Sequence, residues 1–118
     1  MAMEIIWLSL VAISGQPSGQ LNCPGETQRE MTQCSAAEHQ LADAEMTRLY
    51  RGLPRSPELL AAQRAWLAYR DAQCRYEHHA TPEGSMYSME ESMCLTRLTE
   101  QRSEVLAHAA EEGYGSGD

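Results

Sequence analysis

Three stretches with helical spacing of apolar residues, separated by two chain-breaking segments, most constrain the fold of this 118-residue sequence. The first stretch follows Thr27 and Glu30, which have the spacing of a capping box, and it stops at Gly52 and Pro54. Its predicted inward positions are Met31, Cys34, Ala37, Leu41, Ala44 and Leu49. We therefore expect one helix between these two signals.

The second stretch begins at Ser56-Pro57-Glu58, which supplies an N-cap, a proline at the first helical position and an acid in the first turn. This helix is expected to run from Pro57 to about His78. Its apolar positions form two adjoining stripes, with Leu60, Leu67 and Cys74 on one and Leu59, Ala62, Trp66, Tyr69 and Tyr76 on the other. Such a wide apolar arc predicts a helix packed between two neighbours.

The third stretch follows the break at Thr81-Pro82-Glu83-Gly84, with Ser85 or Ser88 as the expected cap, and it ends near Gly113. Its predicted inward positions are Cys94, Leu95, Leu98, Val105 and Ala109. Three helices joined by short turns predict an all-α fold. We expect a three-helix antiparallel up-down-up bundle with the second helix in the middle, or an extended helical hairpin, stapled by two disulfides.

The helical domain is expected over residues 26–112, after an irregular lead-in at 15–25 and before a disordered tail at 113–118. Residues 5–14, IIWLSLVAIS, have the length of a signal-peptide hydrophobic region and are too short to span a bilayer. Glu4 and the absence of a preceding basic residue depart from that pattern. Residues 1–14 are therefore interpreted as a signal-peptide-like segment, with a misplaced start or an apolar segment packed on the domain as alternatives.

The four cysteines, Cys23, Cys34, Cys74 and Cys94, form an even set in a short chain that begins with a signal-like segment, a pattern typical of disulfides and of a secreted or periplasmic protein. Four cysteines allow three connectivities. The expected positions of the cysteines along the helices favour the pairing Cys23–Cys34 with Cys74–Cys94. The alternative pairing is Cys34–Cys74 with Cys23–Cys94. No small residue stands just before Cys23, so a lipoprotein is not expected.

The charge balance restricts the class of partner. Seventeen acidic residues face nine basic ones, all of them arginine, for a net charge of -8. Nucleic acid and anionic membranes would be repelled by such a chain, whereas a basic protein would be attracted. We therefore expect a protein partner and no nucleic acid, and the short apolar segment at 5–14 predicts no membrane span.

Several motifs together resemble one known family. They are TQREMTQC at 27–34, Ala42-Asp43, Tyr50, QRAWLAYRDAQC at 63–74, Cys94-Leu95 and Arg102. Over about residues 22–107 the chain resembles the N-terminal domain of LprI-type lysozyme inhibitors. The resemblance implies a small exported, disulfide-bonded helical domain of bacteria that inhibits lysozyme. Met46-Thr47 departs from the family's usual Leu-Asn, and the lipidation cysteine of the family's namesake is absent.

Two classes of function follow from these observations. The first is a non-enzymatic exported binding protein that inhibits a basic lysozyme, and the second is an envelope-associated structural or interaction module with another ligand. The predicted partner-binding residues, which a solvated helix end would also explain, are Glu83, Met86, Tyr87, Glu90 and Glu91. The residues expected to hold the helices together are Asp43, Tyr50, Trp66, Tyr69, Arg70 and Arg102, with Asp71 as a further ion-pair candidate.

No motif of a nucleophilic, zinc-dependent or phosphate-binding enzyme occurs, so we expect no catalytic residue and no cofactor. Cys74 with His78 or His79 has a spacing that allows a metal site, but such a site requires a reduced Cys74. No metal is therefore expected. His39 and His108 are isolated in the sequence and expected to be exposed.

Overall fold

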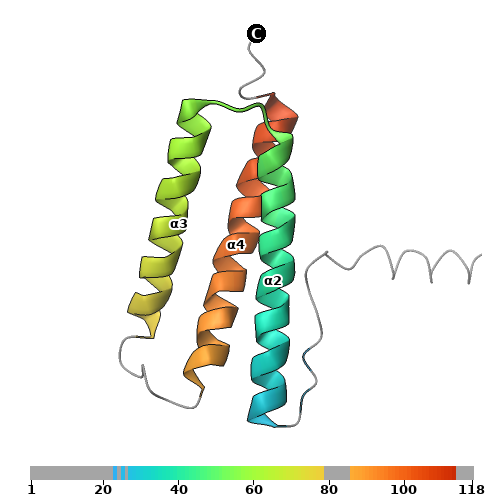
Figure 1. Cartoon of the computed structure of the whole chain (residues 1–118), viewed down its shortest axis with the longest axis vertical. Coiled ribbons are helices and arrows are strands. Elements are labelled where there is room, and N and C mark those ends of the chain that lie inside the picture. Colours follow the sequence, from blue (N-terminus) through green and yellow to red (C-terminus); the bar gives the residue numbers. More distant parts are fainter. Residues whose placement is uncertain (1–22, 24, 26, 79–85, 114–118) are drawn as a thin grey trace, which may run out of the picture.

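The computed structural model describes residues 23, 25, 27–78 and 86–113. Within these residues the chain forms three α-helices and no strand: α2 (Gln28–Gly52), α3 (Pro57–Glu77) and α4 (Tyr87–Glu112). Consecutive helices run in opposite directions (Figure 1), as expected for an antiparallel all-α bundle. None of these helices is long and apolar enough to cross a membrane. The segment at 1–14, most of the lead-in at 15–25, and residues 114–118 of the expected tail lie outside the described residues.

The first two helices begin where local hydrogen bonding predicts. The Thr27 Oγ1 accepts a hydrogen bond from the Glu30 N–H at 3.1 Å, and Glu30 Oε1 accepts one from the Thr27 N–H at 3.2 Å, which completes the capping box. The Ser56 Oγ accepts a hydrogen bond from the Leu59 N–H at 3.0 Å. Side-chain caps therefore set both starts.

The start of α4 differs from the prediction. Met86 is the N-cap residue and makes no side-chain capping bond, and Ser88 lies inside the helix. Ser88 is therefore not the cap, and Ser85 lies outside the described residues. The predicted end is confirmed: Gly113 follows α4 with a left-handed φ of 72°, a conformation that glycine adopts without steric cost.

The order of the helices corrects the expectation that the second one lies in the middle. α4 lies between the other two (Figure 1), packing along α2 on one side and against α3 on the other. The buried residues of α4 are Cys94, Thr96, Leu98, Thr99 and Leu106. Apolar periodicity identifies the buried face of a helix but not the neighbour that covers it, so the pattern did not distinguish α3 from α4 as the central helix.

Two hydrophobic clusters hold the bundle. Met46, Leu53 and Leu106 form the cluster nearer the α2–α3 turn, and Cys74, Cys94 and Leu98 form the other. Trp66 packs against both clusters, with Leu67 and Leu59 of α3 beside the first. One face of α3 therefore supplies its contacts to the core.

The remaining apolar positions of α3 correct the prediction of a helix covered on both sides. Tyr69 and Tyr76 of the second stripe are 54% and 67% exposed, and Leu60 of the first is 41% exposed, so each stripe is only partly in the core. Leu41, Ala44 and Val105 are also exposed rather than inward. Since α3 packs against α4 at one edge of the bundle, the opposite face of α3 is exposed to solvent, including the apolar residues on that face.

Both favoured disulfides are present. Cys23 is joined to Cys34 and Cys74 to Cys94, with Cα–Cα distances of 5.4 Å and 5.7 Å. The first bond requires the lead-in to fold back against α2, and Gly25 permits that approach: a Cβ at this position would lie 2.6 Å from the Glu30 Cβ. The second bond fastens the outer helix α3 to α4.

Candidate functional site

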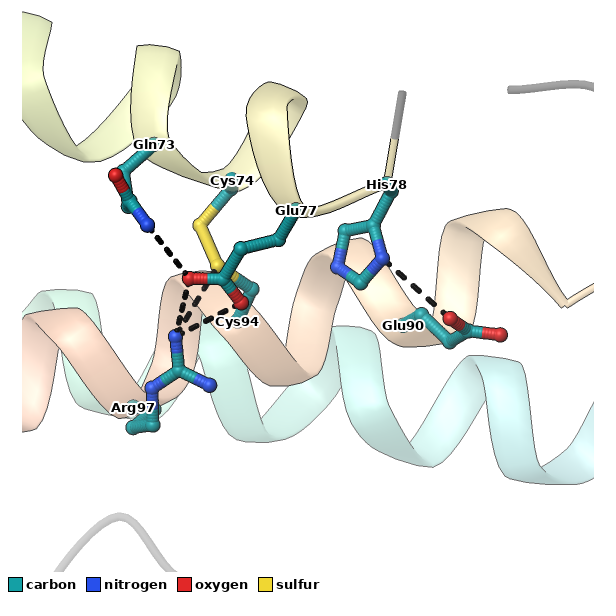
Figure 2. Close-up of polar contacts among 7 residues, drawn as sticks. All are labelled: Gln73, Cys74, Glu77, His78, Glu90, Cys94 and Arg97. Carbon is teal, nitrogen blue, oxygen red and sulfur yellow. Dashed lines mark hydrogen bonds and ion pairs between the residues drawn. A yellow bond between two sulfur atoms is a disulfide. The ribbon is translucent and has the colours of Figure 1, made fainter. Parts of the chain in front are cut away.

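The end of the bundle where α3 stops and α4 starts carries a group of polar side chains around the Cys74–Cys94 disulfide (Figure 2). Arg97 of α4 donates to the Glu77 carboxylate of α3 at 2.7 Å and 3.0 Å, and Gln73 donates to the same carboxylate at 3.1 Å. The hydrogen bond from Arg97, followed by that from Gln73, lowers the pKa of Glu77. Glu77 is therefore a fixed negative charge beside Cys74–Cys94.

Helix geometry explains why Glu77 and Arg97 meet. Each lies three residues after a cysteine of the disulfide, and helical side chains lean toward the N-terminus of their own helix. In antiparallel helices this tilt brings both side chains back to the level of the disulfide. The Arg97 Nη2 lies 3.8 Å from the Cys94 Sγ, which agrees with that geometry.

The predicted partner-binding residues lie one turn farther toward the bundle end. His78 Nδ1 lies 3.4 Å from the Glu90 Oε2, and the rings of His78 and Tyr87 make an edge contact with centroids 6.1 Å apart (Figure 2 shows His78 and Glu90). Met86 is 44% exposed, whereas Tyr87, Glu90 and Glu91 are half-buried. Glu83 lies outside the described residues.

A shallow hollow of about 340 Å³ separates the two helices at this end, and we call it the α3–α4 hollow. It is lined by Glu77, His78, Glu90, Met93, Cys94 and Arg97. Carboxylates, an arginine and an adaptable methionine side chain around one depression form a surface suited to a protein side chain.

A separate polar network joins the three helices around Arg70. This side chain, only 11% exposed, lies 3.6 Å from Asp43 of α2 and 3.0 Å from Asp71 of its own helix. It also donates to the Thr99 Oγ1 of α4 at 3.3 Å, and its guanidinium lies 5.4 Å from the Trp66 ring centroid. Arg70 thus contacts all three helices.

The other residues expected to hold the helices together divide between core and surface. Arg102 lies 5.9 Å from the Trp66 ring centroid and donates to the Gln63 Oε1 at 3.0 Å, while burial lowers its pKa. Tyr50 packs against the first core cluster. Tyr69 does not reach the core, because it projects from the exposed face of α3.

A metal site at Cys74 would need the thiolate of this cysteine as a ligand. Cys74 is oxidised and offers no thiolate to a metal ion. Two groups of described side chains lie close enough to share an ion: Cys23, Cys34 and Glu38, and Glu77, His78 and Cys94. Both groups include disulfide sulfur, so neither supplies the set of donors that zinc requires.

Sequence reasoning missed Glu77, Met93 and Arg97 among the residues that line the α3–α4 hollow. They lie outside the recognised motifs, and isolated charged residues on helices are common. A signal was available once Cys74–Cys94 was favoured, because the equal offset of Glu77 and Arg97 from the two cysteines places both beside the bond. His39 also departs from expectation: its Nδ1 is buried and has no hydrogen-bond partner within the described ranges of the chain.

Comparisons with known proteins agree with the resemblance in the motifs. The family described as "Lysozyme inhibitor LprI" matches residues 22–106, which include all four cysteines and nearly all of the three helices. An uncharacterised protein of Rhizobium meliloti, R02472, is 30% identical over 104 residues, covering 72% of this chain and 75% of the relative. No solved structure matches the chain.

Proposed function

Because the chain belongs to the LprI lysozyme-inhibitor family, we propose that it is an exported, non-enzymatic protein that binds a basic lysozyme and inhibits it. The observation that carries this proposal is the family match, which spans the helical domain and its four cysteines. Two disulfides in so small a domain fit an oxidising compartment outside the cytoplasm.

Charge supports a basic partner. The chain has a net charge of -8, and lysozymes of the animal type are strongly basic. Opposite net charges raise the rate of encounter and favour one set of partners over others. Charge alone does not select lysozyme among basic proteins, so the family match remains the main support.

The end of the bundle supplies a contact surface for this role, and we name Met86, Tyr87, Glu90 and Glu91 the turn-proximal face. The Cys74–Cys94 disulfide and the Glu77–Arg97 pair fix α3 against α4 just behind it. The turn-proximal face combines two carboxylates with an exposed methionine, a composition suited to a basic protein surface.

The proposal is tested by lysozyme-driven lysis of bacterial cell walls in the presence of the oxidised protein, at low and at high salt. We expect dose-dependent inhibition that weakens with salt and disappears after reduction and alkylation. Glu90→Gln/Glu91→Gln should weaken inhibition more than Glu111→Gln/Glu112→Gln, which removes the same charge at the other end of α4. Equal effects of the two double variants would contradict the role of the turn-proximal face.

Absence of inhibition at micromolar excess, with the helical fold and disulfides intact, would contradict lysozyme inhibition itself. The alternative, an envelope-associated interaction module, would then gain support. A pull-down that compares lysozyme with a periplasmic extract separates the two functions.

A further inference from the structure

A second hollow lies between α2 and α4, on the other side of Met93 and Arg97 from the α3–α4 hollow. Its volume is about 180 Å³, and we call it the α2–α4 hollow. It is lined by Ser35, Glu38, Met93, Thr96, Arg97 and Glu100. Met93 and Arg97 line both hollows, so the two form one continuous surface across α4.

Its two carboxylates have no cationic partner among the described residues. Arg97, the basic residue on the rim, turns its guanidinium toward α3, where it binds Glu77 at 2.7 Å (Figure 2). Burial and the like charges of Glu38 and Glu104 raise the pKa of Glu100. The negative charges of Glu38 and Glu100 therefore repel each other across the hollow and are not compensated within the described part of the chain.

Thr96 gives an independent indication that a donor is missing. The residue is only 8% exposed, it lines the α2–α4 hollow, and its Oγ1 is buried with no hydrogen-bond partner among the residues that the structure describes. Buried hydroxyls are nearly always hydrogen-bonded, because an unmatched one loses its interaction with water. An incoming N–H group would supply this bond.

We propose that the α2–α4 hollow binds the cationic end of a lysine or arginine side chain from a protein partner. The two carboxylates compensate its charge, the Thr96 Oγ1 accepts one N–H hydrogen bond, and Met93 covers the aliphatic stem. This proposal deepens the proposed function, because a basic lysozyme presents such side chains on its surface.

A compact metal ion fits the hollow less well. Glu100 belongs to neither group of described side chains that lie close enough to share an ion. Glu38 also lies against the first disulfide, with its Oε1 2.8 Å from the Cys23 Sγ. A lysine or arginine side chain, by contrast, has several N–H donors that the carboxylates and the Thr96 hydroxyl can accept.

The pocket is tested first without lysozyme, by adding N-acetyl-lysine amide to the isotope-labelled oxidised protein and following the backbone amide signals. N-acetyl-norleucine amide, which lacks the ammonium group, is the matched probe. We expect saturable shifts centred on Ser35, Thr96 and Glu100 with the lysine probe only. Shifts spread evenly over the acidic surface, and unchanged in Glu38→Gln/Glu100→Gln, would overturn the proposal.

Thr96→Val separates binding from folding, because valine keeps the shape of threonine and removes the unmatched hydroxyl. We expect the variant to be at least as stable as the native protein and to bind the lysine probe several-fold more weakly. Equal binding by the variant and the native protein would show that the hydroxyl takes no part in recognition.

Binding to lysozyme then separates this inference from the proposed function. If the native protein inhibits lysozyme, Glu38→Gln/Glu100→Gln should lower affinity about tenfold or more relative to Glu111→Gln/Glu112→Gln. Equal affinities would contradict cation binding at the α2–α4 hollow and would leave the proposal of lysozyme inhibition unaffected. If the native protein does not inhibit lysozyme, the proposed function is wrong, and the experiment with the lysine probe alone tests cation binding at the hollow.

Discussion

Arg70 is the residue through which polar contacts join all three helices, and its removal should destabilise the fold. Arg70→Ala would leave the Thr99 hydroxyl, in a fully buried residue, without its donor, and would remove the ion pairs with Asp43 and Asp71. We expect the free energy of unfolding to fall by about 2 kcal/mol, measured by urea denaturation of the oxidised protein.

Arg64→Ala is the matched control, because Arg64 is an exposed arginine of the same helix. It should change stability by less than about 0.5 kcal/mol. If Arg70→Ala were as stable as the control and instead lost a binding activity, Arg70 would be a recognition residue rather than a structural one.

His39 should contribute a pH-dependent part of the stability. Burial, followed by the charge of Arg70, lowers its pKa below the usual 6.5. The unfolded chain then binds a proton at a pH at which the folded chain does not, so the free energy of unfolding falls as pH drops below about 6.5. This loss continues until the folded state is also protonated.

His39→Gln should therefore reduce the loss of stability between about pH 7.5 and about pH 5.5 relative to the native protein. Denaturation at both pH values measures the difference, and the contributions of the other histidines cancel in the comparison. Identical losses in the two proteins would contradict a lowered pKa in the folded state.

At the scale of the helix, the starts and ends predicted from the sequence are accurate wherever a side-chain cap or a glycine sets them. Each of these signals acts within one turn of its own position, so the local sequence is sufficient to predict it. The signals are Thr27 with Glu30, Ser56 with Pro57, and Gly113. Met86 starts α4 without a capping side chain, and there the prediction failed.

The start of α3 offers a direct test of that local control. Ser56→Ala removes the acceptor for the Leu59 N–H and should lower the free energy of unfolding by about 1 kcal/mol. Ser56→Asp supplies another acceptor at the same position and should retain most of the stability. Thermal unfolding of the three proteins distinguishes them, and equal losses in both variants would mean that the cap is not what stabilises this helix end.

The two disulfides should differ in what they contribute to the helices. Cys74 and Cys94 are almost fully buried in the second core cluster and fasten the edge helix α3, whereas Cys23 and Cys34 are half-buried. Cys74→Ala/Cys94→Ala should cost about 3 kcal/mol from the 20-residue separation, and more from the lost packing. Denaturation should show a smaller cost for Cys23→Ala/Cys34→Ala, and the reverse order would contradict the role of α3 packing.

At the scale of the whole molecule, the three helices of the described residues and their antiparallel directions followed from the breaks in the sequence, but their lateral order did not. Alanines and tyrosines of α3 count as apolar in a periodic pattern, yet they tolerate solvent, and Tyr69 and Tyr76 are exposed. The α2–α4 hollow was unpredictable for the same reason. Glu38 and Glu100 are 62 positions apart and meet only because α4, rather than α3, packs along α2.

The charge of the whole molecule leads to a prediction about association kinetics with a basic lysozyme. With a net charge of -8, long-range attraction should increase the association rate at low salt, and screening should remove that increase once the Debye length falls to about 10 Å or less. We expect the association rate constant to fall about tenfold between about 0.01 M and about 0.3 M salt, with a smaller change in the dissociation rate constant. Surface plasmon resonance measures both constants, and lysozyme with acetylated lysines should associate slowly at either salt concentration. An association rate independent of salt would mean that net charge does not guide the encounter, even if the two proteins bind.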